Sequence, residues 1–251
     1  MVVKVFVLRA PGTNCDIETA FAFERAGGEV SFVQIGELAR RKRNLDDCQI
    51  LVIPGGFTYG DYLGAGRILA GEIKRSLALD FEHFISRGGL VLGICNGFQV
   101  LVKAGILPGN NKQSQVAIIT FNDSGKFECR WVYLSVNPNS NCVFTSGLEK
   151  LYLPVAHGEG KFLAGAKILG DIDTPVFYID RAGNKVGYPW NPNGSIKNIA
   201  GICDRSGRIF GLMPHPERHI EPSQYPRWTR EGDQGNAFEI FLNAVRWARA
   251  L

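Results

Sequence analysis

The sequence has no long apolar run and no closely spaced cysteines. None of its apolar stretches approaches the roughly 18 residues of a membrane-spanning helix, and the stretch at 5–8 meets Arg9 and Pro11 too soon for a signal peptide. Of the six cysteines, even the closest two, Cys129 and Cys142, are too far apart for the C-x-x-C pairs of zinc sites. We therefore expect a cytoplasmic protein that has no membrane partner and whose thiols are mostly buried and unpaired.

The sequence also has little net charge and lacks the common nucleotide-binding motifs. The formal net charge is only +4, which argues against nucleic acid as a partner. The chain has no P-loop, and Gly64-Ala65-Gly66 lacks the third glycine of a dinucleotide fingerprint. His215, Glu217 and His219 do not form the helical H-E-x-x-H zinc motif. We therefore expect no cofactor and no metal on this chain.

Glycine is in excess, with 30 of 251 residues, or about 12% against a usual ~7%. In the first half, short apolar runs alternate with amphipathic segments of helical length. Strands are predicted at 2–8, 29–34, 50–53 and 90–94, and helices at 15–26, 63–87 and 97–103. This alternation predicts one α/β domain over residues 1–251, with a largely parallel central sheet flanked by helices.

The pattern changes after Pro108. Strands without helices between them are predicted at 116–121, 127–135, 150–155 and 176–179. Residues 199–203 and 208–213, split by Asp-Arg-Ser-Gly, predict a hairpin, and a helix at 235–251 closes the chain. We therefore expect extra antiparallel strands in the second half.

Residues 93–97, Gly-Ile-Cys-Asn-Gly, follow a predicted strand and precede a predicted helix. This is the G-x-S-x-G nucleophile-elbow pattern with Cys95 in place of serine. The sharp turn needs glycine two positions to either side because larger side chains would collide. The thiol would lie at a helix N-terminus, where unpaired N–H groups favour a thiolate. Cys95 is therefore a candidate nucleophile, with a buried cysteine in a glycine-rich turn as the alternative.

A thiol nucleophile needs a base that a third group orients, and two His-x-Glu pairs offer one. His215 and Glu217 lie in Pro-His-Pro-Glu directly after a predicted strand, and the prolines keep this segment extended so that both side chains can point the same way. His157 and Glu159 follow another predicted strand at the same spacing. Spacing alone leaves both pairs open.

An acyl intermediate also needs N–H donors for its oxyanion. The backbone N–H of Asn96, directly after Cys95, can supply one. The other can come from residues 53–57, Ile-Pro-Gly-Gly-Phe, because two glycines let the backbone turn its amides inward. Both loops should lie at the carboxyl edge of the sheet, where α/β proteins bind ligands.

The stretch GICNGFQ at 93–99, together with PHPE at 214–217, resembles the class I, triad-type glutamine amidotransferases. Other stretches are similar to a narrower group within that family, the glutaminase subunits of phosphoribosylformylglycinamidine synthases. These stretches are RAPGTNCD at 9–16, PGGFTYGDY at 54–62, AHGEG at 156–160 and NPNGS at 191–195. The similarity covers nearly the whole chain and implies the flavodoxin-like fold of the family.

The resemblance implies roles for the matching residues. Cys95 would attack the side-chain amide of glutamine, form a γ-glutamyl thioester and release ammonia. His215 would move the protons, and Glu217 would orient His215, so the resemblance prefers this pair to the one at 157 and 159. The remaining roles would be oxyanion binding by the N–H groups of Gly56 and Asn96, and glutamine binding by Gln99.

The resemblance also implies partners. Ammonia would pass to a separate synthetase subunit, which would use ATP and magnesium to convert formylglycinamide ribonucleotide to formylglycinamidine ribonucleotide in de novo purine biosynthesis. A small third subunit would join the complex. The loops at 54–63 and 221–235 would face the partner, and the second is expected to dock through Tyr225, Arg227, Trp228 and Arg230. Thr58 and Gly64 depart from the family pattern, where serine and a basic residue are usual.

Two other classes of protein compete with this interpretation. A stand-alone cysteine hydrolase or peptidase could use the same elbow on the same fold, and a non-catalytic binding subunit could keep the fold only for assembly. The presence of Cys95, His215 and Glu217 argues against the binding subunit. The partner-type loops and Gln99 argue against the stand-alone hydrolase.

Overall fold

The computed structural model describes residues 2–109, 115–231 and 237–250, and within them nine strands form one sheet in the order β2-β1-β3-β4-β11-β10-β9-β6-β7. Its strands are β1 (Val3–Arg9), β2 (Gly28–Gln34), β3 (Ile50–Ile53), β4 (Leu90–Ile94), β6 (Glu128–Val136), β7 (Lys150–His157), β9 (Asp173–Ile179), β10 (Ile199–Cys203) and β11 (Ile209–Leu212). A second, small sheet pairs β5 (Ala117–Phe121) with β8 (Glu159–Ala164).

The large sheet is parallel from β2 to β11 and antiparallel from β11 to β7. In β3 and β4 every residue is buried and all but one are large and apolar, which is typical of parallel strands covered on both faces. The predicted α/β fold is confirmed, and so is the hairpin of β10 and β11. The antiparallel strands of the second half extend the parallel sheet, whereas β5 and β8 stand apart from it.

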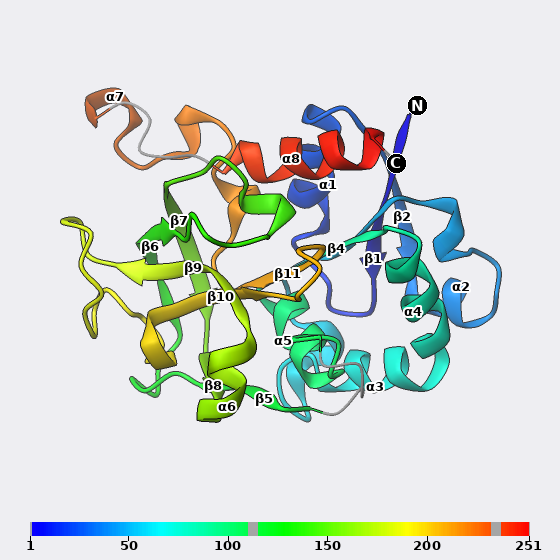
Figure 1. Cartoon of the computed structure of the whole chain (residues 1–251), viewed down its shortest axis with the longest axis horizontal. Coiled ribbons are helices and arrows are strands. Elements are labelled where there is room, and N and C mark those ends of the chain that lie inside the picture. The colour runs from blue at the N-terminus through cyan, green and yellow to red at the C-terminus, as the bar shows by residue number, and fades with distance from the viewer. Residues whose placement is uncertain (1, 110–114, 232–236, 251) are drawn as a thin grey trace.

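Helices cover both faces of the parallel half (Figure 1). The helices of the described residues are α1 (Asp16–Arg25), α2 (Ile35–Ala39), α3 (Arg67–Ser76), α4 (Ala78–Ser86), α5 (Asn96–Lys103), α6 (Ala166–Asp171), α7 (Trp228–Glu231) and α8 (Phe238–Arg249), of which α6 and α7 lie away from the parallel half. On one face α1 and α8 lie side by side, with the rings of Phe23 and Phe241 edge to face at 5.0 Å between centroids. On the other face α5 packs on β3, β4 and β11 and is covered by α3. Among the described residues, no helix is both long and apolar enough to cross a membrane.

One predicted helix proves to be two. The periodicity at 63–87 predicts a single helix, but α3 ends and α4 begins at Leu77. The backbone of Leu77 has φ −131° and ψ 8°, outside the helical region, and its side chain is only 2% exposed. The chain therefore changes direction at a residue anchored in the core, and no glycine or proline marks the break.

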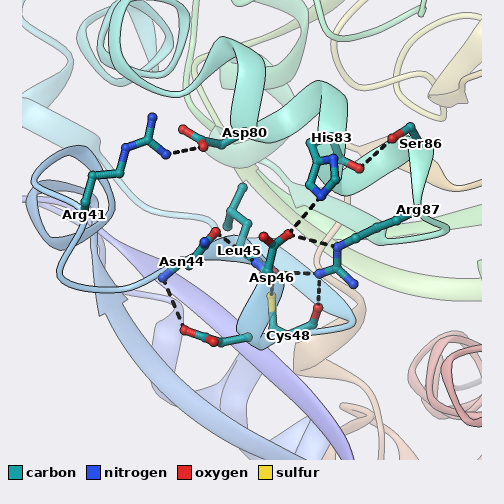
Figure 2. Close-up of polar contacts among 10 residues, drawn as sticks. Arg41, Asn44, Leu45, Asp46, Cys48, Asp80, His83, Ser86 and Arg87 are labelled. Carbon is teal, nitrogen blue, oxygen red and sulfur yellow. Dashed lines mark hydrogen bonds and ion pairs between the residues drawn. The ribbon is translucent and has the colours of Figure 1, made fainter.

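A polar network joins the segment before β3 to α4 (Figure 2). Asp46 lies 3.5 Å from Nε2 of His83 and 3.2 Å from Nε of Arg87. Nearby, the exposed side chain of Arg41 forms an ion pair with Asp80. These contacts link the segment before β3 to α4 and the residue that follows it.

Candidate active site

Cys95 lies in a sharp turn between β4 and α5, as the elbow pattern predicts. Its φ of 49° is in the left-handed region, which residues with a side chain rarely adopt. A Cβ atom on Gly93 would come within 2.5 Å of Leu101 Cδ1, and one on Gly97 within 1.8 Å of the carbonyl oxygen of Ile53. Both glycines are therefore needed for a turn that holds the thiol at the carboxyl edge of the sheet.

His215 reaches the same edge because β11 runs parallel to β4. It precedes the short 3₁₀ helix η5 (Pro216–Arg218). Its Nδ1 lies 2.6 Å from Oε1 of Glu217, and the two side chains are 2% and 0% exposed. Its Nε2 has no hydrogen-bond partner of standard length among the described residues, and Cys95 is one of the groups that interact with this ring. The carboxylate therefore fixes one ring nitrogen and leaves the other for the thiol.

The pKa of His215 lies well above its ordinary value. Burial lowers this pKa, but the negative charge of Glu217 and the sulfur of Cys95 raise it by more, and hydrogen bonding to the Cys15 and Cys95 thiols adds to the effect. An imidazole that holds a proton readily beside a thiol favours transfer of the thiol proton to the ring. The site is thus suited to nucleophilic attack by sulfur.

The second His-x-Glu pair does not form. Nδ1 of His157 contacts Oδ1 of Asn122 at 3.1 Å, and burial together with the charge of His215 lowers the pKa of His157 to about 3. The carboxylate of Glu159 points elsewhere and lies 3.3 Å from Nζ of Lys103. Of the two pairs that the spacing leaves open, the structure joins only the one at 215 and 217.

The loop after β3 meets the elbow through side chains. Gly56 has φ 140°, and a Cβ atom there would come within 2.8 Å of the backbone nitrogen of Asn14. The hydroxyl of Thr58 donates to Oδ1 of Asn96 at 2.6 Å. A serine could donate the same bond, so the departure from the family pattern at this position keeps the contact. The segments that carry the two predicted oxyanion donors, Gly56 and Asn96, therefore lie together.

Gln99 is buried, with 3% of its surface exposed, and its amide is used inside the protein. Nε2 donates to the carbonyl oxygen of Glu159 at 2.5 Å, and Oε1 accepts from Nδ2 of Asn96 at 2.9 Å. That Gln99 helps to hold the glutamine stays a prediction. In this structure Gln99 positions Asn96 and the start of β8.

Sequence reasoning gave no role to Cys15, which the structure places in the site. Donor atoms of Cys15, His215 and Glu217 lie within 4.8 Å of one another, a sulfur, nitrogen and oxygen set that could hold a metal ion. However, Nδ1 and Oε1 of the histidine and glutamate already share a hydrogen bond, and Nη2 of Arg218 donates to Sγ of Cys15 at 3.0 Å. These contacts suit a proton-transfer site better than a metal site. No sequence pattern joins residues that are 203 positions apart.

The predicted docking segment at 221–235 is only partly described, because 232–236 lie outside the described residues. Arg227 and Arg230 are exposed, and Trp228 is 51% exposed. Tyr225 is buried, with its ring packed against other aromatic side chains. The prediction that Tyr225 belongs to a docking surface is therefore wrong, since its ring contributes to the core.

Comparison with known proteins agrees with this geometry. Residues 2–248 match the CobB/CobQ-like glutamine amidotransferase domain. The phosphoribosylformylglycinamidine synthase subunit PurQ of Dehalococcoides mccartyi is 55% identical in an alignment of 250 residues that covers 98% of each chain. The corresponding subunit of Archaeoglobus fulgidus is 43% identical over 99% of this chain and 98% of its own. A chain in the structure of PurLQS from Thermotoga maritima is 34% identical, with a TM-score of 0.75 and 98% of both chains covered. The resemblance drawn from the elbow and the Pro-His-Pro-Glu segment is confirmed, and the chain belongs to the CobB/CobQ-like glutamine amidotransferase family.

Proposed function

We propose that this chain is the glutaminase subunit of a phosphoribosylformylglycinamidine synthase and acts in the cytoplasm. It hydrolyses L-glutamine and supplies ammonia to a synthetase subunit that makes formylglycinamidine ribonucleotide in de novo purine biosynthesis. The observation that carries the chemistry is the buried pair of His215 and Glu217 beside Cys95 in its strained turn. The similarity to PurQ subunits over nearly the whole chain supports the pathway and a complex with a synthetase and a small third subunit.

The reaction begins with transfer of the Cys95 thiol proton to Nε2 of His215. The sulfur attacks the side-chain amide carbon of glutamine, and the N–H groups of Gly56 and Asn96 donate to the oxygen that becomes negative. His215 then gives its proton to the leaving nitrogen, the carbon–nitrogen bond breaks, and ammonia leaves a γ-glutamyl thioester. Water attacks the thioester while His215 accepts the water proton, and glutamate departs as the thiol is restored.

Glu217 acts on the reaction through His215. Its carboxylate bonds Nδ1, which fixes the ring orientation and leaves Nε2 for the thiol. Its charge also stabilises the imidazolium formed in the first step, in agreement with the raised pKa of His215. Glu217 itself transfers no proton in this scheme.

A stand-alone hydrolase would use the same three groups, but the surface near the site favours a partner. The loop after β3 exposes large apolar side chains: Phe57 at 47%, Tyr62 at 88% and Leu63 at 66%. Phe57 stacks on Phe127, itself 53% exposed, with 6.5 Å between centroids. Several large apolar side chains exposed on one loop are typical of an interaction site. We therefore place the synthetase subunit over this loop.

We expect the chain alone to be a poor glutaminase that assembly activates at least tenfold. Tyr59 and Asp61 in this loop have φ values of 56° and 53°, a conformation that costs on the order of 1–3 kcal/mol per residue. Docking of the partner on Tyr62 and Leu63 would hold the strained loop in place, and a misplacement of about 1 Å in a site can cost about 100-fold in rate. Glutamate release is measured from the chain alone, and then with synthetase, ATP and nucleotide substrate.

The matched variants are Tyr62→Ala, in the loop, and Leu79→Ala, which removes another strongly exposed apolar side chain, 76% against 88%, from α4. Tyr62→Ala should reduce the activation, and Leu79→Ala should leave it unchanged. Equal rates of glutamate release with and without the partner would contradict the proposal and favour a stand-alone hydrolase.

A further inference from the structure

The side chain of Cys15 is enclosed between the loop after β3 and the imidazole of His215. Cys15 precedes α1, its side chain is 2% exposed, and its backbone N–H donates to the carbonyl oxygen of Gly55 at 3.3 Å. A Cβ atom on Gly55 would lie 2.8 Å from Cε1 of His215 and 3.1 Å from Sγ of Cys15. The sulfur and the imidazole therefore pack against the same glycine, which leaves no space for another side chain between them.

The sulfur of Cys15 is also the anchor of Arg218. Nη2 of Arg218 donates to Sγ of Cys15 at 3.0 Å, and Nε lies 3.6 Å from Oε1 of Glu18 on α1. The same Nε also forms a longer ion pair with Oε1 of Glu217, at 3.9 Å. The guanidinium is thus held by Cys15, at the cap of α1, and by Glu18 on α1, and it lies beside the carboxylate of Glu217.

The carboxylate of Glu217 should attract the guanidinium of Arg218 strongly. The Glu217 side chain is fully buried, and Oε2 has no hydrogen-bond partner among the described residues. An unpaired buried carboxylate oxygen is costly, and arginine can satisfy both oxygens of a carboxylate at once. Without a competing acceptor, Arg218 would move onto Glu217.

We propose that the Cys15 thiol limits Arg218 to this long ion pair with Glu217, so that the carboxylate stays committed to His215. Cys15 is then a positioning residue, and the proposal rests on the proposed function because it serves the same catalytic pair. If Arg218 moved into a close pair with Glu217, it would compete with Nδ1 of His215 for Oε1, and its nearer positive charge would disfavour the imidazolium. The imidazole of His215 would then bind the proton from Cys95 less tightly.

The charged and titratable groups around His215 define the test. They come from four elements: Glu217 and Arg218 from η5, Cys15 and Glu18 from the start of α1, Cys95 from the cap of α5, and His157 from β7. His157 has its pKa lowered to about 3 and stays neutral over the range of the experiment. Cys95 would titrate together with His215, so the measurement is made in a Cys95→Ala background.

The readout is the titration midpoint of His215 in the full chain, followed by NMR of histidines labelled at Cε1. The chain has only four histidines, which makes assignment with a His215→Gln variant direct. Cys15→Ala should lower the midpoint by about one pH unit or more, the size expected for a change in a neighbouring charge. Cys15→Ser should stay near the parent value because its hydroxyl still accepts from Arg218. If the alanine variant unfolds, Cys15→Val replaces it, because valine also removes the sulfur but fills the space that alanine would leave empty.

The decisive comparison adds Arg218→Met. In that background Cys15→Ala should lower the midpoint of His215 by much less, because only the direct hydrogen bond of the thiol to the ring is lost and no guanidinium remains to capture Glu217. An unchanged midpoint in Cys15→Ala with Arg218 present would overturn the proposal. An equal fall with and without Arg218 would also overturn it, since the whole effect of Cys15 would then be its direct contact with the ring. Failure of the proposed function would instead appear as glutaminase activity that survives Cys95→Ala, which these titrations do not measure.

Discussion

Replacement of Cys95 by alanine is expected to abolish glutamine-dependent synthesis in the assembled complex while synthesis from added ammonium continues. The substitution removes the sulfur that carries the acyl group, so no ammonia is released from glutamine. The synthetase reaction takes place on another chain and loses only its nitrogen supply. Product formation is measured with glutamine and, separately, with an ammonium salt as the nitrogen source.

Cys48→Ala is the matched control for this experiment. Cys48 is another buried thiol, but it lies before β3 at the opposite end of the sheet, and burial raises its pKa to about 12. The control should keep both activities if it folds. Glutamine-dependent synthesis that persisted in Cys95→Ala would show that Cys95 is not the nucleophile.

His215→Ala should lower glutaminase turnover by on the order of 10²- to 10⁴-fold, the usual contribution of a general acid–base group. The variant leaves the thiol without a proton acceptor and the leaving nitrogen without a donor. Glu217→Gln should cost less, because Glu217 orients the ring and transfers no proton. Turnover is measured in the complex, where the site is expected to be fully formed.

His157→Ala tests the choice between the two His-x-Glu pairs. His157 has a pKa lowered to about 3, so it is a weak base that stays neutral at physiological pH. Its loss should affect turnover far less than the loss of His215, with any effect arising from the packing around Asn122. A larger fall in turnover for His157→Ala than for His215→Ala, in variants that both fold, would reverse the assignment.

The parts of the fold that could be predicted are those that the local sequence dictates. The apolar runs of β3 and β4 have the predicted bounds because a strand covered on both faces must be apolar throughout. The elbow could be predicted because its steric needs lie within five residues, and the positions of Gly93 and Gly97 satisfy them. The break at Leu77 could not, since it depends on a side chain that tertiary packing draws into the core.

In the site, only the residues that come directly after a predicted strand could be placed from the sequence. Spacing could not separate His215 from His157, because the difference lies in contacts made by distant elements, such as that of Glu159 with Lys103. The same holds for Gln99, whose side-chain amide donates a hydrogen bond to the first residue of β8. Cys15 was missed because its neighbours in the site come from the far end of the chain.

The most direct test of the central claim is mass spectrometry of the complex quenched with acid shortly after glutamine is added. We expect a γ-glutamyl group on the peptide that contains Cys95, and no such group in the Cys95→Ala variant. Cys15 serves as an internal control, because it lies in the same site but is placed here as a positioning residue. A γ-glutamyl group on Cys15, or ammonia release at full rate with no adduct on Cys95, would show that Cys95 is not the nucleophile.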